Sequence, residues 1–201
     1  MRIDADRQFW CSGLTQTRIT AGEWRGRVIT TPAGNELRPT RSLVREALFN
    51  ILSGDIPDCL FLDLYAGAGT VGFEALSRGA ASVTFVEKRR EALGLLASTV
   101  QRFKCEDRIE LINADAVNWL RAHPDIGAAY DVVFLDAPYR DESIDAALTA
   151  LGASPPALVV CEHHSSRPLA EHFGALRLVR QVHYGTNELS FFRPSGGSRA
   201  E

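Results

Sequence analysis

The sequence predicts an α/β fold: a mostly parallel, seven-stranded sheet with helices on both faces and an antiparallel hairpin at its C-terminal end. From Cys59 onward, short apolar runs alternate with segments of helical periodicity, which is typical of strands joined by crossover helices. The first apolar run passes through Gly67 and Gly69 into a helical segment. The last two runs flank Gly185 and Thr186, a pair suited to a tight hairpin turn.

The individual elements follow from this alternation in chain order. The expected strands span residues 59–65, 82–87, 108–113, 130–136, 157–162, 176–184 and 187–193. The expected helices span residues 70–78, 89–103, 116–122, 143–151 and 167–173. The longest of them places its apolar side chains on one face, namely Leu93, Leu96, Val100 and Phe103.

The chain ahead of the sheet has a different character. Residues 1–17 show no sustained periodicity, and we expect a poorly ordered extension there. Residues 18–30 alternate around Gly22 and Gly26, which favours a hairpin, and a helix is expected from Thr40 to a stop at Gly54. We therefore divide the chain into an extension (1–17), an N-terminal hairpin and helix (18–54), the sheet domain (55–193) and a loose Gly/Ser-rich tail (194–201).

Composition bounds the class of protein. With 201 residues, 45% of them hydrophobic and 23% charged, the chain is sized for one globular core and has no apolar run of membrane-spanning length. The first residues lack the apolar stretch of a secretory signal, so we expect a cytoplasmic protein. We also expect a monomer that binds no membrane. The four cysteines lack zinc-ligand spacing, which favours reduced thiols and no metal site.

A local basic cluster lies near the N-terminus, although the formal net charge of −3 argues against binding nucleic acid by bulk charge alone. Its members, set against only two acids, are Arg18, Arg25, Arg27, Arg38, Arg41 and Arg45. Such a cluster is most often a solvated face. The alternative, which the later motifs favour, is an arm that contacts nucleic-acid phosphates, with Trp24 available to stack on a base.

Polar residues follow several of the expected strands at one edge of the sheet. In open α/β sheets, ligands bind beyond the carboxyl ends of the strands. That rule gathers into one crevice Asp63, Gly67, Gly69, Glu87, Asp115, Asp136 and Tyr139. Each has a structural alternative: Glu87 as a surface acid, Asp115 as a helix cap and Tyr139 as a half-buried loop aromatic. Because acids at successive strand ends are together hard to explain by solubility, we favour a binding site.

Two cofactors fit such a crevice. A dinucleotide would place its pyrophosphate on the glycine pattern that ends at Gly72 and its ribose on Glu87. S-adenosylmethionine would place its amine on Asp63, its ribose diol on Glu87 and its adenine on Asp115. A carboxylate at position 63 has no role beside a pyrophosphate, so the sequence favours the methyl donor and leaves a nicotinamide-dependent oxidoreductase as the rival.

The turn DAPY (136–139) indicates the reaction. An exocyclic amine on a nucleobase is a poor nucleophile because its lone pair is delocalised into the ring. The Asp136 carboxylate and the Ala137 carbonyl are expected to accept its two N–H groups and so aim the lone pair at an incoming methyl. Pro138 would stiffen the turn, and Tyr139 would stack on the extruded base. These four are the candidate catalytic residues.

Six segments in combination resemble one known family: TAGEWRGR (20–27), LRPT (37–40), VREALFN (44–50), DLYAGAG (63–69), EALSRGA (74–80) and DAPY (136–139). Over about residues 18–192 they are similar to the RsmD family, bacterial methyltransferases that act on the exocyclic N2 of a guanine in small-subunit (16S) ribosomal RNA. Two departures stand out. Ala137 replaces the first of two prolines usual in the turn, and Ser42-Leu43 replaces a common Asp-Arg pair.

The resemblance implies a class I, Rossmann-like methyltransferase fold, S-adenosylmethionine as cofactor, no metal, and small-subunit ribosomal RNA or the assembling 30S particle as partner. The cofactor residues that it implies by position are Asp63, Tyr65, Gly67, Gly69, Glu87, Asp115, Ala116 and Asp136. The implied RNA contacts are Arg18, Trp24, Arg25, Arg27, Arg38 and Arg41.

Three other interpretations of the sequence stay open. An adenine-N6 methyltransferase acting on DNA or RNA would use the same turn, since the turn suits either amine; the chain, however, has little outside the sheet from which to build a DNA target-recognition domain. The oxidoreductase is the rival from another enzyme class. An RNA-binding module with a vestigial pocket is the non-enzymatic rival.

Overall fold

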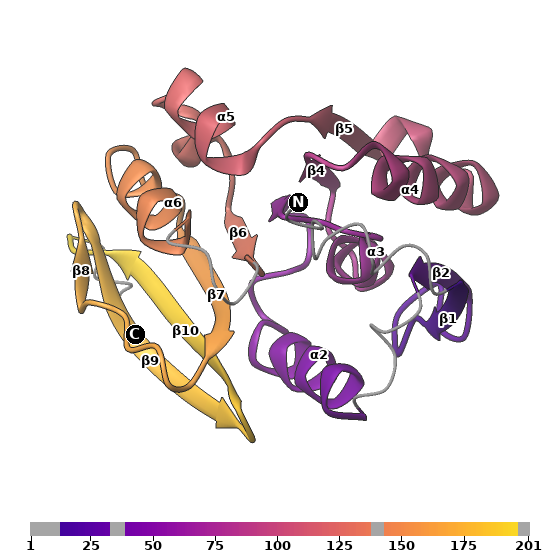
Figure 1. Ribbon diagram of the computed structural model, residues 1–201, viewed down its shortest axis with the longest axis horizontal. Helices are drawn as coiled ribbons and strands as arrows, with labels where there is room; N and C mark the ends of the chain where they lie inside the picture. The colour runs from indigo at the N-terminus through magenta and orange to yellow at the C-terminus, as the bar shows by residue number, and fades with distance from the viewer. Residues whose placement is uncertain (1–12, 33–38, 138–142, 197–201) are drawn as a thin grey trace, which may run out of the picture.

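The fold is described from a computed structural model that covers residues 13–32, 39–137 and 143–196, with residues 39–41 described by their backbone alone. It consists of one large sheet with helices on both faces and a separate two-stranded hairpin (Figure 1). Several expectations lie outside the described residues: residues 1–12 of the extension, Arg38, the Arg41 side chain, Pro138, Tyr139 and the end of the tail.

The large sheet has eight strands in the order β5-β4-β3-β6-β7-β10-β9-β8. They are β3 (Leu60–Leu64), β4 (Ser82–Glu87), β5 (Ile109–Asn113), β6 (Val132–Leu135), β7 (Leu158–His164), β8 (His172–Phe173), β9 (Leu176–Tyr184) and β10 (Asn187–Pro194). The first five run parallel, and β10 pairs antiparallel with both β7 and β9. Strand order reverses around β3, whose neighbours are β4 and β6, so the ligand crevice is expected at that point.

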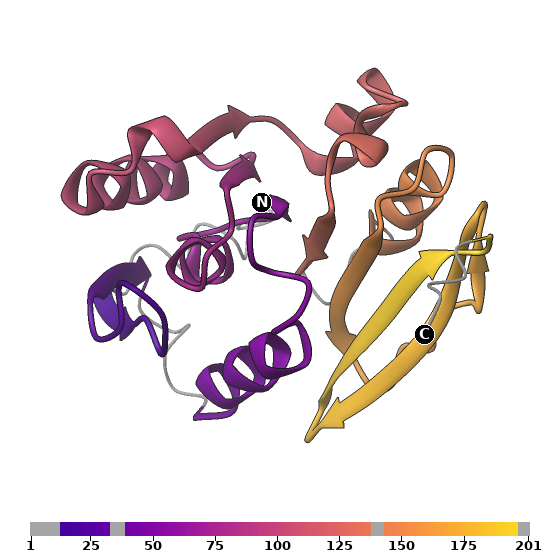
Figure 2. The same ribbon diagram turned by 180° about the vertical axis from the view of Figure 1, so that it is seen from behind.

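The helices divide between the two faces of the sheet. They are α2 (Pro39–Ile51), α3 (Thr70–Ser77), α4 (Arg90–Phe103), α5 (Ala116–Ala122) and α6 (Ser143–Leu151), with short 3₁₀ turns η1 (Glu106–Arg108) and η2 (Ile126–Ala129). One hydrophobic cluster joins the sheet to α2, α3 and α4, and a second joins it to α5 and α6. Seen from behind, the purple helices lie between the indigo hairpin and the orange and yellow strands (Figure 2).

β6 illustrates why a continuous apolar run forms a central strand here. All four of its residues are buried. Val132 and Phe134 point into the cluster with α2, α3 and α4, whereas Val133 and Leu135 point into the cluster with α5 and α6. A parallel strand covered by helices on both faces needs apolar side chains at every position, which is the pattern in the sequence.

The N-terminal hairpin shares the core of the sheet domain. It is formed by β1 (Leu14–Arg18) and β2 (Val28–Pro32). Three of its apolar side chains, Ile19, Trp24 and Ile29, belong to the cluster that contains Phe73 of α3 and Phe103 of α4. The proposed division between residues 54 and 55 therefore separates segments of chain that share one hydrophobic core.

The predicted α/β class with a C-terminal antiparallel hairpin is confirmed, and α5, α6 and β9 have their expected bounds. Two details differ at the edges. The first hairpin begins at Leu14, four residues inside the expected extension, because β1 pairs with β2 from Leu14↔Pro32 onward. The sheet has eight strands instead of seven, because the short β8 adds to the outer edge of β9.

The expected helix over residues 167–173 is wrong. The chain there is irregular, with bends at Arg167 and Glu171, and then forms β8, whose backbone continues the sheet. Leu169 and Phe173, four residues apart, suggest a helix face, but both are buried against the sheet from an extended chain. The Glu171 carbonyl accepts the Leu178 N–H at 2.8 Å across the sheet edge, and this hydrogen bond, together with the pairing of β8 with β9, holds the chain in an extended form.

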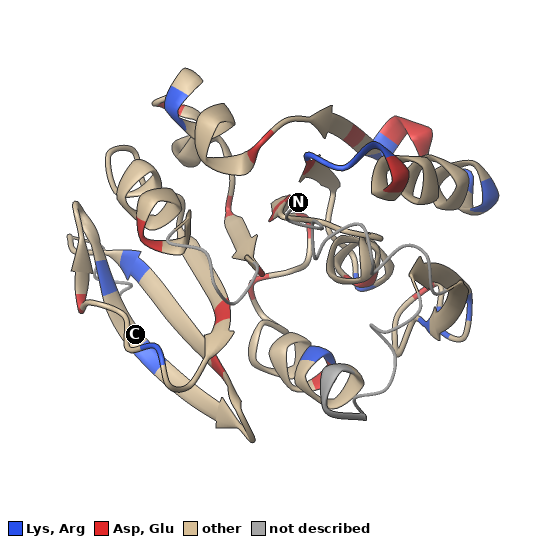
Figure 3. Cartoon of the chain, viewed as in Figure 1, with Lys and Arg blue, Asp and Glu red and all other residues tan. Residues whose placement is uncertain are grey.

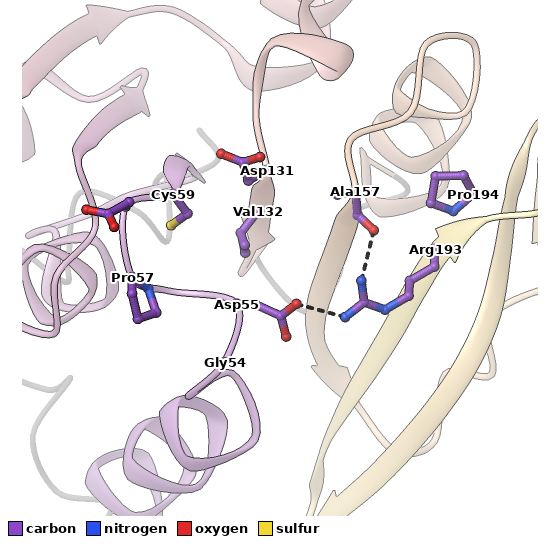
Figure 4. A pocket seen from close by; sticks show the side chains of 10 residues that line it. Gly54, Asp55, Pro57, Cys59, Asp131, Val132, Ala157, Arg193 and Pro194 are labelled. Atoms are coloured by element: carbon purple, nitrogen blue, oxygen red, sulfur yellow. Dashed lines mark hydrogen bonds and ion pairs between the residues drawn. The ribbon is translucent and has the colours of Figure 1, made fainter. Parts of the chain in front are cut away.

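A cavity of about 580 Å³ opens at the edge where the parallel strands begin, away from the strand ends that carry the candidate residues (Figure 4). Inside it, the Arg193 guanidinium donates to Asp55 Oδ1 at 3.0 Å and to the Ala157 carbonyl at 3.3 Å. These contacts tie the end of β10 to the connection between α2 and β3. Cys59 also lines the cavity; like Cys105 and Cys161 it is a free, buried thiol. No helix among the described residues has the length and apolarity to cross a bilayer.

Candidate active site

The glycine loop between β3 and α3 uses its two glycines differently. Both have positive φ, +57° at Gly67 and +76° at Gly69, a region that favours glycine. A Cβ on Gly69 would lie 2.3 Å from Leu96 Cδ2, so this residue lets α3 pack against α4. A Cβ on Gly67 would meet nothing within 4 Å. Gly67 is therefore the position where the loop backbone is open to a ligand.

Two buried carboxyl groups shape this loop from the neighbouring strand ends. Asp63, 2% exposed, accepts the Gly72 N–H at 3.0 Å, and Glu87, 3% exposed, accepts the Gly67 N–H at 2.8 Å. The second Glu87 oxygen accepts from the backbone N–H and Nε of Arg89 at 2.9 and 3.1 Å. Glu87 is thus a buried acid, which removes the alternative that it is a surface residue.

Burial raises the pKa of Asp63 to about 8, and the charges of Asp136 and Glu87 act in the same direction, whereas the Gly72 N–H opposes them. Burial therefore favours the protonated form of this carboxyl group. Its described contact is with the loop, and the predicted contact between Asp63 and the amine of a methyl donor stays a prediction.

Asp115 and Ala116 begin α5, next to the crevice. The Asp115 side chain accepts the Asn118 N–H at 3.2 Å, which is the geometry of an N-cap. The structural alternative for Asp115 is therefore present, and its contact with an adenine amine stays a prediction. Ala116 lines the cavity described next.

A cavity of about 60 Å³ brings candidate residues from three strand ends together. It is lined by Tyr65, Val86, Glu87, Lys88, Arg89, Ala114, Ala116 and Asp136. Asp136 follows β6 and is half-buried, and Ala137 is 2% exposed. Tyr65 has a positive φ of +62°, an uncommon value for an aromatic residue at the point where the chain leaves β3. The structure thus places Asp136 beside the glycine loop and Glu87, as the strand-end rule predicts.

Lys88 and Arg89 are site residues that the sequence analysis did not single out. Figure 3 shows basic residues along the connection from β4 to α4. Two of them, Lys88 and Arg89, line the cavity. The signal in the sequence was the run of three cations directly after Glu87. Arg89 places its guanidinium next to a carboxylate that we expect to bind the cofactor.

The N-terminal arginines separate into two groups. Arg25 is exposed and its side chain has no partner among the described residues, whereas Arg18 is exposed and donates to the Gly26 carbonyl at 2.9 Å. The Arg27 guanidinium lies 3.8 Å from the centroid of the Phe103 ring and donates to the Arg102 carbonyl at 2.7 Å. Arg45 is buried, which lowers its pKa, although Glu74 opposes that shift. Arg25 and Arg18 are therefore the better candidates for contact with a phosphate.

The prediction that Trp24 stacks on a base is wrong. Its side chain is 5% exposed and packs edge-on against Phe103, with ring centroids 5.1 Å apart. An aromatic ring that fills the core between the hairpin and α4 is closed to a nucleobase.

Comparison with known proteins places the chain in a family. Residues 17–193 match the family described as "Conserved hypothetical protein 95". A protein of Haemophilus influenzae named "Ribosomal RNA small subunit methyltransferase D" is 38% identical over 159 residues, 77% of this chain and 82% of that protein. The chain belongs to this family, the RsmD family. The Escherichia coli protein of the same name is 40% identical over 129 residues, 64% of this chain and 63% of its own length.

Solved structures agree with this membership. The Escherichia coli protein yhhF has 30% identity and a TM-score of 0.77, covering 90% of this chain and 98% of its own. A methyltransferase of magnesium protoporphyrin IX from Synechocystis, solved with bound SAM, has 14% identity and a TM-score of 0.61, with coverage of 80% and 82%. That distant likeness concerns the fold, which is of the class I methyltransferase type. The RsmD family match spans all of the described site residues.

Proposed function

We propose that this member of the RsmD family is an S-adenosylmethionine-dependent methyltransferase that places a methyl group on the exocyclic N2 of a guanine in small-subunit ribosomal RNA. One observation carries the proposal. Glu87, the last residue of β4, and Asp136, which follows β6, line the same cavity beside the glycine loop. The names of the family relatives support the substrate class.

The residues present fit S-adenosylmethionine. The loop is open over Gly67, which suits close approach of a ligand to the backbone, and Glu87 is a carboxylate suited to two adjacent ribose hydroxyls. The Ala116 methyl group gives the cavity an apolar surface on which the flat face of an aromatic ring can pack. We assign these three residues to holding the cofactor. When bound, S-adenosylmethionine supplies a methyl group made electrophilic by a positively charged sulfur.

The chain's own contribution to the reaction is to orient the amine. The Asp136 carboxylate and the Ala137 carbonyl oxygen accept one N–H each, so the nitrogen lone pair is directed out of the plane of the base. The nitrogen would form a bond to the methyl carbon as the bond from that carbon to sulfur breaks, with the electron pair kept by the sulfur of S-adenosylhomocysteine. It would then release one proton to water or to Asp136 Oδ. Because the substitution of proline by alanine at position 137 retains the carbonyl, this role survives the departure from the family pattern.

Arg25 and Arg18 are assigned to phosphate contacts, since both are exposed on the hairpin. Phosphate contacts position an RNA on a protein without reading its sequence. We therefore assign selection of the target guanine to the crevice and the loop after β6. We assign affinity for the RNA to the hairpin.

Titration calorimetry with S-adenosylhomocysteine and, separately, NADH tests the cofactor. We expect binding of the first alone; binding of NADH alone would replace this proposal with an oxidoreductase. Asp136→Ala should abolish methyl transfer from labelled donor while S-adenosylhomocysteine affinity stays within about twofold of wild type. The control Asp107→Ala, which removes an exposed carboxylate from η1, should leave transfer unchanged. Retained turnover in Asp136→Ala would remove this residue from the mechanism.

Mass-spectrometric mapping tests the substrate. Small-subunit ribosomal RNA from cells that lack the gene should lose one N2-methylated guanine. Purified protein should restore that methyl group, and comparing naked RNA with assembled 30S particles as acceptor identifies the natural form. Loss of an N6-methylated adenine instead would move the activity to the other amine.

A further inference from the structure

Glu74 in α3 is a buried acid around which an unusual number of donors converge. Its side chain is 0% exposed. One carboxylate oxygen accepts from the Thr20 hydroxyl at 2.6 Å and from the Ala21 N–H at 3.1 Å. The other accepts the Thr20 N–H at 2.9 Å. Both acceptor atoms of this helix residue are therefore used by the segment that follows β1.

Two arginines complete the arrangement. Arg78 Nε donates to Glu74 Oε1 at 2.9 Å, and its Nη2 donates to the Thr20 hydroxyl at 2.9 Å. Arg45 of α2 lies 3.5 Å from Glu74 Oε2 and donates to the Arg18 carbonyl at 2.8 Å. A buried carboxylate is stable only when paired and hydrogen-bonded. Here the ion pairs come from α2 and the end of α3, whereas three of the hydrogen bonds come from Thr20 and Ala21 of the docked hairpin.

The next turn of α3 continues this contact. The Ser77 carbonyl accepts the Glu23 N–H at 2.7 Å, and the Ser77 hydroxyl accepts the Trp24 N–H at 2.9 Å. A Cβ on Gly22 would lie 1.8 Å from the Ser77 carbonyl oxygen, so the backbones touch where only glycine fits. Two segments that the sequence analysis quoted separately, TAGEWRGR and EALSRGA, thus form one interface.

The opposite end of the same helix carries the glycine loop. α3 begins after Gly69, and the N–H of Gly72 in its first turn donates to Asp63. The helix has eight residues, Thr70–Ser77, and therefore spans only about 12 Å. A short helix of this kind moves as one body, so whatever fixes its C-terminal half to the hairpin also fixes the hairpin relative to the cofactor loop.

We propose that Glu74 is a positioning residue that holds the arginine-bearing hairpin at a fixed place relative to the glycine loop, so that RNA bound by the hairpin is presented to the methyl donor in register. This inference rests on the proposed function. Glu74 acts through Thr20 and Ala21, and touches neither the cavity-lining residues nor, in this assignment, the substrates.

Trypsin digestion of the full-length protein without RNA measures docking of the hairpin directly, since the protease cleaves after arginine. In Glu74→Gln the amide nitrogen replaces an acceptor by a donor and faces N–H groups. We expect cleavage after Arg18 and Arg25 to be at least about tenfold faster than in wild type. Thr20→Val, which removes one hydroxyl and leaves the carboxylate in place, should give a smaller increase. The control Glu171→Gln makes the same chemical change at an exposed residue and should leave cleavage unchanged.

Kinetics then separate positioning from general stability. For Glu74→Gln we expect KM for undermethylated small-subunit RNA to rise at least about tenfold, while the Kd for S-adenosylhomocysteine stays within about twofold. Unchanged cleavage and unchanged KM would overturn the proposal. So would loss of S-adenosylhomocysteine binding in step with KM, because Glu74 would then maintain the fold as a whole. If Glu74→Gln does not fold, the cleavage rate, the KM for RNA and the Kd for S-adenosylhomocysteine are compared between Thr20→Val and wild type instead.

The two proposals fail in different ways. If wild-type protein transfers no methyl group to small-subunit RNA, the proposed function fails, yet the RNA-free cleavage comparison still decides whether Glu74 docks the hairpin.

Discussion

Alanine substitutions at Gly67 and Gly69 form a matched pair that tests how the glycine loop is built. Both residues have positive φ, so each substitution carries a backbone cost of about 1–2 kcal/mol. Gly69→Ala adds a steric cost, because its Cβ would lie 2.3 Å from Leu96 Cδ2 and 2.9 Å from Phe73 Cε2, and both side chains are fully buried. Overpacking of this kind typically costs a further ~1–3 kcal/mol.

The expected losses in free energy of unfolding are therefore about 1–2 kcal/mol for Gly67→Ala and about 2–5 kcal/mol for Gly69→Ala. Urea unfolding followed by circular dichroism measures both. In folded protein, the affinity for S-adenosylhomocysteine should be reduced more by Gly67→Ala than by Gly69→Ala. The new Cβ at position 67 projects into open space over the loop, and we expect S-adenosylhomocysteine to bind at least about tenfold more weakly.

Equal destabilisation by the two substitutions would refute the argument from packing. Wild-type affinity for S-adenosylhomocysteine in Gly67→Ala would show that the open side of the loop faces away from the cofactor, and the assignment of the crevice would have to move.

Three further predictions concern charged residues, one in the site and two on the N-terminal hairpin. Asp63 has a pKa of about 8 in the folded protein, above its value of about 4 in the unfolded chain. Between these two pH values the folded protein holds one more proton than the unfolded chain. The contribution of Asp63 to the free energy of unfolding therefore falls as pH rises through that range. Asp63→Asn keeps an acceptor for the Gly72 N–H and should flatten this fall, measured by urea unfolding at pH 5 and pH 8.5; an unchanged slope would contradict it. Arg25→Ala should weaken RNA binding and lower its salt slope by about one phosphate contact, without loss of stability. Arg27→Ala should lower the melting temperature instead, because its guanidinium stacks on Phe103, and a reversal of the two phenotypes would reassign these arginines.

Periodicity predicted most of the sheet domain because its central strands and its helices have distinct patterns of apolar residues. β6, buried on both faces, is a continuous apolar run, and α6 buries Ile144, Ala147, Leu148 and Leu151 at helical spacing. Segment 167–173 has no such clear pattern of apolar residues. Two apolar residues four apart fit a helix or an extended edge equally well, and the choice depended on pairing with β9, which local sequence does not encode.

The site was predictable where it depends on strand ends and not where it depends on contacts between distant segments. Asp136, Glu87 and the glycine loop meet because parallel strands end at one edge of a sheet. The burial of Trp24 depends on Phe103, which comes from α4. An aromatic residue between arginines has the composition of a stacking platform, and only the packed fold distinguishes that from a core residue. The role of Glu74 was hidden for the same reason, since its partners come from another part of the chain.

The outer edge of the sheet limits how these molecules associate. β8 pairs with only the first two residues of β9, Leu176 and Arg177. Along the rest of β9, Arg180 and His183 are exposed, and a register shift interrupts the pairing with β10 between Phe191 and Phe192. The Arg180 cation and the irregular pairing discourage an incoming strand from extending the ladder at this edge.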